Sequence, residues 1–216
     1  MSSLSDLPLA WPVTGHTVLG RGRVSLFVED EITGPTGGQP FHRQYITHPG
    51  AVGIIAVDDR DRVAVVRQYR HPVGMELVEP PAGLLDGVDE DPLDAAQREL
   101  AEEASLRADH WSVLVDVATS PGGSEESARV YLATGLAQTD RPDGFVLEHE
   151  EAHMLVGWEP FPDLVDGILD GRLQSPLLVA GVMALATARA TGRDLRPADA
   201  PWPVRGVHAE QQRERA

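Results

Sequence analysis

Residues 83–106 read GLLDGVDEDPLDAAQRELAEEASL, and this stretch predicts a helix that begins at Pro92. Asp91 stands at the position of an N-cap residue, and proline is favoured at the first position of a helix. Apolar residues then recur at spacings of three and four, which gives the helix one apolar face; these residues are Leu93, Ala96, Leu100 and Ala104. The stretch therefore predicts an amphipathic helix that packs against a core.

The same helix carries three carboxylates on a second face. Glu99, Glu102 and Glu103 stand at positions i, i+3 and i+4, so their side chains converge. Like charges at this spacing destabilise an isolated helix by about 0.2–0.5 kcal/mol per pair. A divalent cation such as Mg2+ or Mn2+ would offset the repulsion, because these ions prefer carboxylate oxygens. A solvated acidic face is the alternative interpretation of the three glutamates alone.

The order of residues around this helix resembles the signature of the Nudix hydrolases, which runs Gly, five residues, Glu, seven residues, then Arg-Glu-apolar-any-Glu-Glu-any-Gly. The part from Arg98 to Glu103 matches at every fixed position, and Glu90 precedes Arg98 at the required spacing. Gly83 lies one residue too far from Glu90, which implies an insertion in the loop before the helix. Ser105 replaces the glycine that normally follows the helix, where glycine would form a left-handed C-cap.

Two further runs, QYRHPVG at 68–74 and EPPAGLLD at 79–86, resemble the ADP-ribose pyrophosphatase branch of the family. The resemblance implies a set of metal ligands: Glu99, Glu102, Glu103, the carbonyl of Ala82 and, from a later loop, Glu150. It also implies that Arg98 orients the helix carboxylates, that Glu102 acts in catalysis and that Glu90 braces the loop.

Four residues are candidates for substrate binding: Arg43, Arg70, Glu79 and Arg67. Arginine forms forked contacts with phosphate oxygens, and the resemblance implies this role for Arg70 and, across from a second subunit, for Arg43. For Arg67, pairing with surface carboxylates is the alternative. The run SPGGSEE at 120–126 resembles a loop near the substrate, although an ordinary hairpin connection is the plainer interpretation.

The acidic run LEHEEAH at 147–153 is the second predicted source of carboxylates. Hydrolysis of a pyrophosphate needs a water molecule that is deprotonated and aimed in line at phosphorus. In related enzymes a loop glutamate does this. Glu148 and Glu150 match that position best, Glu151 competes with them, and a solvated loop is the alternative interpretation.

Composition narrows the class of protein. The chain has 216 residues, a net charge of -16 and 42% hydrophobic residues, so it can bury a core. It contains no cysteine, which excludes disulfides and thiolate metal sites. The negative charge argues against nucleic acid or an anionic membrane as a partner. The N-terminal residues lack the pattern of a signal peptide, so we expect a cytoplasmic protein.

Hydrophobic patterning predicts the remaining elements. Strands are expected at 23–31, 41–47, 51–57, 62–68, 76–78, 112–118, 128–133 and 153–158, and helices at 161–173 and 176–191. Residues 1–22 show no clear pattern. This mixture predicts an α/β (α+β) protein, and the resemblance implies a Nudix-type α/β/α sandwich with a mixed sheet. We expect four regions: an N-terminal β region exchanged in a dimer (1–47), the Nudix core (48–172), a C-terminal helix (173–192) and an irregular tail (193–216).

The resemblance implies that a homodimer hydrolyses ADP-ribose to AMP and ribose 5-phosphate with Mg2+ or Mn2+. Another nucleoside diphosphate compound, such as a sugar nucleotide or a dinucleotide, is an alternative substrate. A non-catalytic ADP-ribose sensor and an acidic scaffold are alternatives of a different class. The intact signature glutamates favour an enzyme over a sensor.

Overall fold

The computed structural model describes residues 4–87, 89–142 and 153–208. Its largest sheet has the strand order β11-β8-β9-β4-β7. β4 runs parallel to β9, whereas the other neighbours are antiparallel, so the sheet is mixed. The strands are β4 (Ala51–Ala56), β7 (Ala82–Leu84), β8 (Leu106–Ala118), β9 (Ser127–Gln138) and β11 (Arg196–Pro197).

A second, antiparallel sheet has the order β10-β5-β6. It consists of β5 (Arg62–Arg70), β6 (Met75–Glu79) and β10 (Leu155–Pro160). The short 3-10 helix η1 (His71–Val73) connects β5 to β6, and Gly74 closes it with a φ of 63°. The last residue of β5, Arg70, therefore lies opposite the first residue of β6, Met75.

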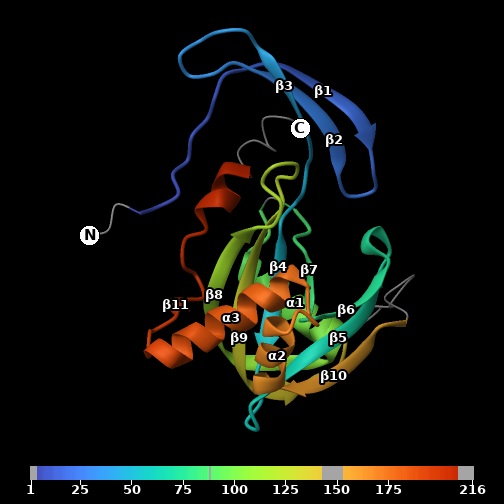
Figure 1. Ribbon diagram of the computed structural model, residues 1–216. Coiled ribbons are helices and arrows are strands. Elements are labelled where there is room, and N and C mark those ends of the chain that lie inside the picture. The colour runs from blue at the N-terminus through green and yellow to red at the C-terminus, as the bar shows by residue number, and fades with distance from the viewer. Residues whose placement is uncertain (1–3, 88, 143–152, 209–216) are drawn as a thin grey trace.

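Helices cover the main sheet on both faces, as Figure 1 shows. Successive side chains of a strand point to opposite faces, and β4 follows this rule. Ile54 belongs to a buried cluster with Leu100 of α1 (Pro92–Ala104), whereas Ile55 belongs to another with Val182 of α3 (Pro176–Thr191). The remaining helix, α2 (Phe161–Leu169), packs in the second cluster through Leu164. The predicted α/β/α sandwich is confirmed.

α3 lies close to the sheet because Gly181 faces it. A Cβ at Gly181 would come within 2.7 Å of Ile55 and 2.8 Å of Val130, so a larger residue would push the helix away. The predicted helix at 161–173 is too long, since α2 ends at Leu169 and Gly171, with a φ of 74°, reverses the chain. Among the described residues, no helix combines the length and the apolarity needed to cross a bilayer.

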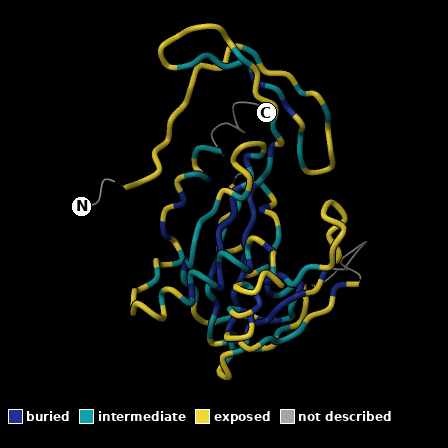
Figure 2. Tube along the Cα trace, in the orientation of Figure 1, coloured by how far each residue is buried: buried dark blue, intermediate teal, exposed yellow. Residues whose placement is uncertain are grey.

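The N-terminal residues form a third sheet, in the order β1-β2-β3, that stands apart from the main body in Figure 1. Its strands are β1 (Val13–Arg21), β2 (Leu26–Ile32) and β3 (Phe41–Ile46). β1 lies within residues 1–22, where the sequence shows no clear pattern. The pattern is missing because most side chains of β1 are exposed on either face. Figure 2 shows buried residues concentrated in the main body and mostly exposed ones in this sheet.

The C-terminal segment differs from the irregular tail that the sequence predicts. It contains β11 and a helical segment at 203–208. Arg129 of β9 donates hydrogen bonds to the carbonyls of Ala200 at 2.7 Å and Pro201 at 3.0 Å, and its guanidinium lies 5.1 Å from the ring centre of the buried Trp202. The segment is ordered by contacts with a distant strand, which local patterning does not reveal.

Candidate active site

α1 begins and ends as its sequence dictates. Asp91 accepts a hydrogen bond from the Leu93 amide at 2.7 Å, which is the N-cap contact that the sequence predicts. At the other end Ser105 adopts the left-handed conformation, with φ 53° and ψ 40°, and its amide donates to the Ala101 carbonyl. The turn that a glycine would form is therefore kept, although a residue with a Cβ occupies it.

We expect Ser105→Gly to stabilise the protein by about 1 kcal/mol, since the left-handed conformation costs an ordinary residue roughly 1–2 kcal/mol and glycine loses part of that gain as backbone entropy. Urea unfolding measures the change, with Ser105→Ala as the matched control, because alanine keeps the Cβ. A Ser105→Gly variant no more stable than Ser105→Ala would show that the turn carries no strain.

Arg98 lies at the centre of an acidic cluster beside α1. Its Nη1 donates to Glu99 Oε1 at 2.7 Å and to Glu102 Oε2 at 3.2 Å. Its Nη2 donates to Glu90 Oε1 at 3.2 Å and to the Leu84 carbonyl at 3.2 Å. Arg98 thus joins two helix carboxylates to the loop before the helix, an arrangement that fits the orienting role implied by the resemblance.

The charge of Arg98 is secured by its neighbours. Burial by itself would lower the pKa of Arg98, but the charges of Glu99, Glu90 and Asp86 outweigh it and raise the pKa above its usual value. The arginine therefore stays protonated, and it offsets much of the repulsion between the glutamates that the sequence alone predicts.

Glu90 braces the loop that follows β7. Its Oε2 accepts a hydrogen bond from the Asp86 amide at 2.5 Å, while Oε1 is held by Arg98. Six residues separate Gly83 from Glu90, one more than the signature has. Both ends of the loop reach the helix despite this insertion.

Glu99 and Glu103 lie against the start of β7. Glu103 is 7% exposed, and its Oε2 accepts a hydrogen bond from the Ala82 amide at 2.9 Å. A Cβ at Gly83 would lie 2.0 Å from Glu99 Oε1, so a larger residue there would displace the Glu99 carboxylate from this position. Glycine therefore leaves room for the Glu99 carboxylate to lie against the backbone of β7.

The donor set suits a hard divalent cation, because carboxylate and carbonyl oxygens are the ligands that Mg2+ and Mn2+ prefer. In residues 4–87, 89–142 and 153–208, no three acidic or histidine side chains are arranged closely enough to hold such an ion. Glu99 and Glu102 instead turn to Arg98, and Glu103 turns to the backbone of Ala82. To bind a cation, these side chains would have to exchange their contacts with Arg98 and Ala82 for contacts with the ion.

Two further predicted residues, Arg70 and Glu79, pair with each other. The Arg70 Nε and Nη2 both contact Glu79 Oε2, at 2.8 and 2.7 Å. Arg67 pairs with Glu159 at 3.0 Å, and both side chains are at least one third exposed. The pairing of Arg67 is the surface contact named as its alternative role.

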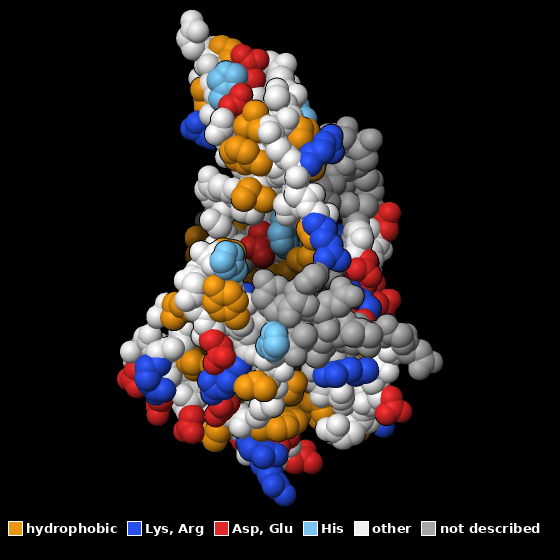
Figure 3. All heavy atoms as spheres, turned by 90° about the vertical axis from the view of Figure 1, so that its right-hand side faces the viewer, with side chains coloured by type: hydrophobic (Ala, Val, Ile, Leu, Met, Phe, Trp, Pro, Cys, Tyr) orange, Lys and Arg blue, Asp and Glu red, His pale blue; other side chains and the backbone are white. Residues whose placement is uncertain are grey.

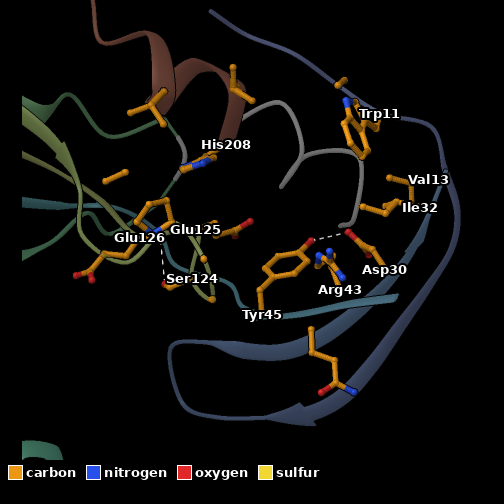
Figure 4. A pocket seen from close by; sticks show the side chains of 18 of the residues that line it. Trp11, Val13, Asp30, Ile32, Arg43, Tyr45, Ser124, Glu125, Glu126 and His208 are labelled. Carbon is orange, nitrogen blue, oxygen red and sulfur yellow. Dashed lines mark hydrogen bonds between the residues drawn. The ribbon is translucent and has the colours of Figure 1, made fainter. Parts of the chain in front are cut away.

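Arg43 lies in a different place, in a cleft of about 1090 Å3 between the N-terminal sheet and the main body. In Figure 4, Trp11, Arg43 and Tyr45 extend from the N-terminal segment, while Glu125 and His208 lie across from them. The space-filling view shows a hollow below the N-terminal sheet (Figure 3). Among the described residues that line the cleft, none comes from α1, so the single chain does not bring Arg43 to the helix glutamates.

Sequence reasoning missed the contacts that hold the loop at 120–126. The Glu125 amide donates to the Ile46 carbonyl at 3.0 Å, and Glu125 Oε1 accepts from the His48 amide at 3.2 Å. Burial lowers the pKa of His48, and the charges of Glu126 and Glu125 oppose this shift. Nothing in the local pattern distinguishes these acids from a solvated turn, since their partners lie far away in the chain.

The three candidates for the catalytic base, Glu148, Glu150 and Glu151, lie outside the described residues. Their assignment, and that of Glu150 as a metal ligand, therefore remain predictions.

Residues 47–176 match the family model of the NUDIX domain. The chain is 42% identical over 184 residues to an ADP-ribose pyrophosphatase of Mycobacterium tuberculosis, which covers 85% of this chain and 87% of that protein. It is 37% identical over 153 residues to a methanol dehydrogenase activator of Bacillus methanolicus, which covers 71% of this chain and 76% of that protein.

A solved structure supports the fold. The crystal structure of an ADP compounds hydrolase superposes with a TM-score of 0.69 over 88% of this chain and 100% of that chain, at 19% identity. The matched domain spans β4 to α2, and it includes the helix with its Arg98 cluster. The resemblance inferred from the signature is confirmed, and the chain belongs to the Nudix hydrolase family.

Proposed function

We propose that this protein hydrolyses the diphosphate bond of ADP-ribose to give AMP and ribose 5-phosphate, with Mg2+ or Mn2+ as the cofactor. The observation that carries the proposal is the cluster in which Arg98 binds Glu90, Glu99 and Glu102, with the Glu99 carboxylate lying beside Gly83. The name of the Mycobacterium tuberculosis relative supplies the substrate. Its alignment covers most of both chains, which supports transfer of the substrate class.

The helix glutamates and the backbone carbonyl of Ala82 would hold the cation. When bound, such an ion offsets the charge of the diphosphate and activates water for attack on phosphorus. Arg98 and Glu90 keep the glutamates in place through the contacts described above, and Glu102 belongs to both the ligand set and the catalytic set. We assign the base to one of Glu148, Glu150 and Glu151.

Arg70 and Arg43 supply positive charge for the substrate. A chain of net charge -16 repels a diphosphate, so local arginines must reverse the field at the site. One oxygen of Glu79, at the end of β6, contacts two nitrogens of the Arg70 guanidinium, at the end of β5. These two contacts fix the orientation of the guanidinium. We propose that Arg70 and Glu79 form the substrate-binding edge of the site, whereas Arg67 keeps its surface pair with Glu159.

A substrate panel tests the proposed activity. The purified protein is incubated with ADP-ribose, a sugar nucleotide or a dinucleotide, with Mg2+ or with EDTA, and the products are separated by chromatography. We expect AMP and ribose 5-phosphate from ADP-ribose, only with Mg2+, at a higher kcat/KM than for the other compounds. Preferential cleavage of a sugar nucleotide would reassign the substrate, and tight binding of ADP-ribose without cleavage would indicate a sensor.

We further propose that two copies of the chain pair through the N-terminal region, residues 1–47. The sheet leaves several large apolar side chains exposed; they are Val13, Leu19, Val24, Phe27 and Ile46. Exposed apolar side chains are candidates for an interface where they gather into a patch, and Phe27 and Ile46 stand opposite each other on β2 and β3. A partner copy packed against this region would bury such side chains. Arg43 lines the cleft on the face of the sheet opposite Phe27 and Ile46, and the resemblance supports its role across the subunit boundary.

Sedimentation equilibrium tests the dimer. We expect a mass of twice 23.3 kDa for the wild-type protein and a lower mass for Phe27→Glu, because a charge in the interface is costly to bury. Val73→Glu is the matched control, since Val73 is 59% exposed on η1, away from the sheet. A wild-type mass of 23.3 kDa would contradict the dimer and would remove the proposed role of Arg43.

A further inference from the structure

Arg205, in the C-terminal helical segment, makes two contacts that join distant parts of the chain. Its Nη1 donates to the Pro49 carbonyl at 2.5 Å and its Nη2 donates to the Gly87 carbonyl at 2.6 Å. The residue is 8% exposed. A buried guanidinium with charge-assisted bonds to two carbonyls fixes their separation, because its donors form a rigid planar fork.

One of these carbonyls belongs to the signature loop. The Gly87 carbonyl also accepts the Glu90 amide at 3.4 Å, and the Glu90 carboxylate binds the Asp86 amide and Arg98. Arg98 in turn holds Glu99 and Glu102. A continuous path of hydrogen bonds therefore runs from Arg205 through the loop to the helix glutamates.

The other carbonyl lies at the start of the main sheet. Pro49 precedes Gly50, whose carbonyl accepts the Leu85 amide at 3.1 Å. A Cβ at Gly50 would lie 3.0 Å from Leu85 and 3.6 Å from Arg205 Nη1, so the three residues pack closely. The loop is consequently held against the sheet from two sides.

The tail that carries Arg205 is itself fixed. Arg129 binds the carbonyls of Ala200 and Pro201 and also pairs with Asp116 at 2.7 Å, and its side chain is 3% exposed. Arg196 of β11 reaches the same aspartate at 2.8 Å. Arg205 therefore contacts the loop from a segment that Arg129 and Arg196 hold in place.

We propose that Arg205 is a positioning residue for the diphosphate hydrolysis assigned above. It holds the loop before α1 at Gly87, so that Glu90 stays in contact with Arg98 and Arg98 with the helix glutamates. The C-terminal segment is then part of the catalytic architecture. The proposal rests on the proposed function for its kinetic consequence and on the contacts alone for its structural consequence.

Kinetics and hydrogen exchange on Arg205→Ala test the role, with Arg193→Ala as the matched control, because Arg193 is an exposed arginine in the same tail. We expect kcat of Arg205→Ala to fall about 10-fold, the low end for loss of an outer contact to a metal site. KM for ADP-ribose should change by less than about twofold, since Arg205 acts through the loop by its contact with the Gly87 carbonyl and the rate loss comes from the geometry of the reacting groups. Arg193→Ala should match the wild type in both.

Hydrogen exchange gives a readout that does not depend on activity. In Arg205→Ala the amides of Leu85, Asp86 and Glu90 should exchange faster than in the wild type, while those of α3 stay unchanged. Should Arg205→Ala fail to fold, Arg205→Lys keeps the charge and the stem but not the fork, and the same changes are expected from it.

Two results separate the proposals. If the variant only lowers the melting temperature, while kcat per folded molecule and the exchange of the three loop amides stay at wild-type values, Arg205 is merely structural and the positioning role is wrong. If the wild-type protein itself fails to cleave ADP-ribose, the proposed function is wrong, and the exchange measurement still decides whether Arg205 holds the loop.

Discussion

Glu102→Gln is expected to lower kcat for diphosphate hydrolysis by at least about 100-fold, because a bound cation supplies several kcal/mol of charge stabilisation and each 1.36 kcal/mol is a factor of ten in rate. Glutamine keeps the size of the side chain and removes its charge. The helix should remain intact, since the Glu102 carboxylate contributes one 3.2 Å contact to Arg98 and is repelled by its acidic neighbours.

Steady-state kinetics over a range of Mg2+ concentrations, together with thermal unfolding, measures both effects. Asp94→Asn is the matched control, because Asp94 is an exposed carboxylate in the first turn of the same helix and takes no part in the Arg98 cluster. It should retain wild-type turnover. Near-normal turnover in Glu102→Gln would count heavily against a metal site on this helix.

Gly83→Ala should produce a loss of similar size for a steric reason. Its Cβ would lie 2.0 Å from Glu99 Oε1 and 2.1 Å from the Glu99 carboxylate carbon, so either the carboxylate or β7 must move. Overpacking of this kind costs about 1–3 kcal/mol of stability. A displaced Glu99 also loses its 2.7 Å contact with Arg98, and we expect kcat to fall by about 100-fold, as for loss of a ligand.

Gly157→Ala is the matched control, because a Cβ there would meet only Val65 at an ordinary distance of 3.9 Å. Its kcat should equal that of the wild type. Both variants are compared by urea unfolding and by turnover with saturating Mg2+. A fully active Gly83→Ala would show that Glu99 need not lie against the backbone of β7.

The helix and its carboxylates could be predicted because the relevant signals are local. The Asp91 cap, the apolar face from Leu93 to Ala104 and the spacing of the glutamates all lie within one helix. Ser105 departs from the signature, and the structure shows that it adopts the left-handed conformation that glycine would adopt there. Local sequence and local structure agree at this site.

The contacts that frame the helix could not be predicted in the same way. Arg129 orders the tail through a carbonyl that lies 71 residues later in the chain, and Arg205 binds Pro49 and Gly87, which lie 156 and 118 residues earlier. The residues next to Arg129 and Arg205 in the sequence do not distinguish these buried arginines from exposed ones. The strand β1 cannot be predicted, because its side chains are exposed on both faces and the sequence lacks the alternation of apolar and polar residues that identifies a strand.

The central claim is that the helix glutamates hold a divalent cation against a diphosphate. A crystal of the protein soaked with Mn2+ and a non-hydrolysable ADP-ribose analogue tests it most directly, since manganese is located by its anomalous scattering. We predict manganese at coordinating distance from carboxylate oxygens of Glu99, Glu102 and Glu103, with the diphosphate beside it. Manganese and analogue bound away from these three side chains would contradict the account.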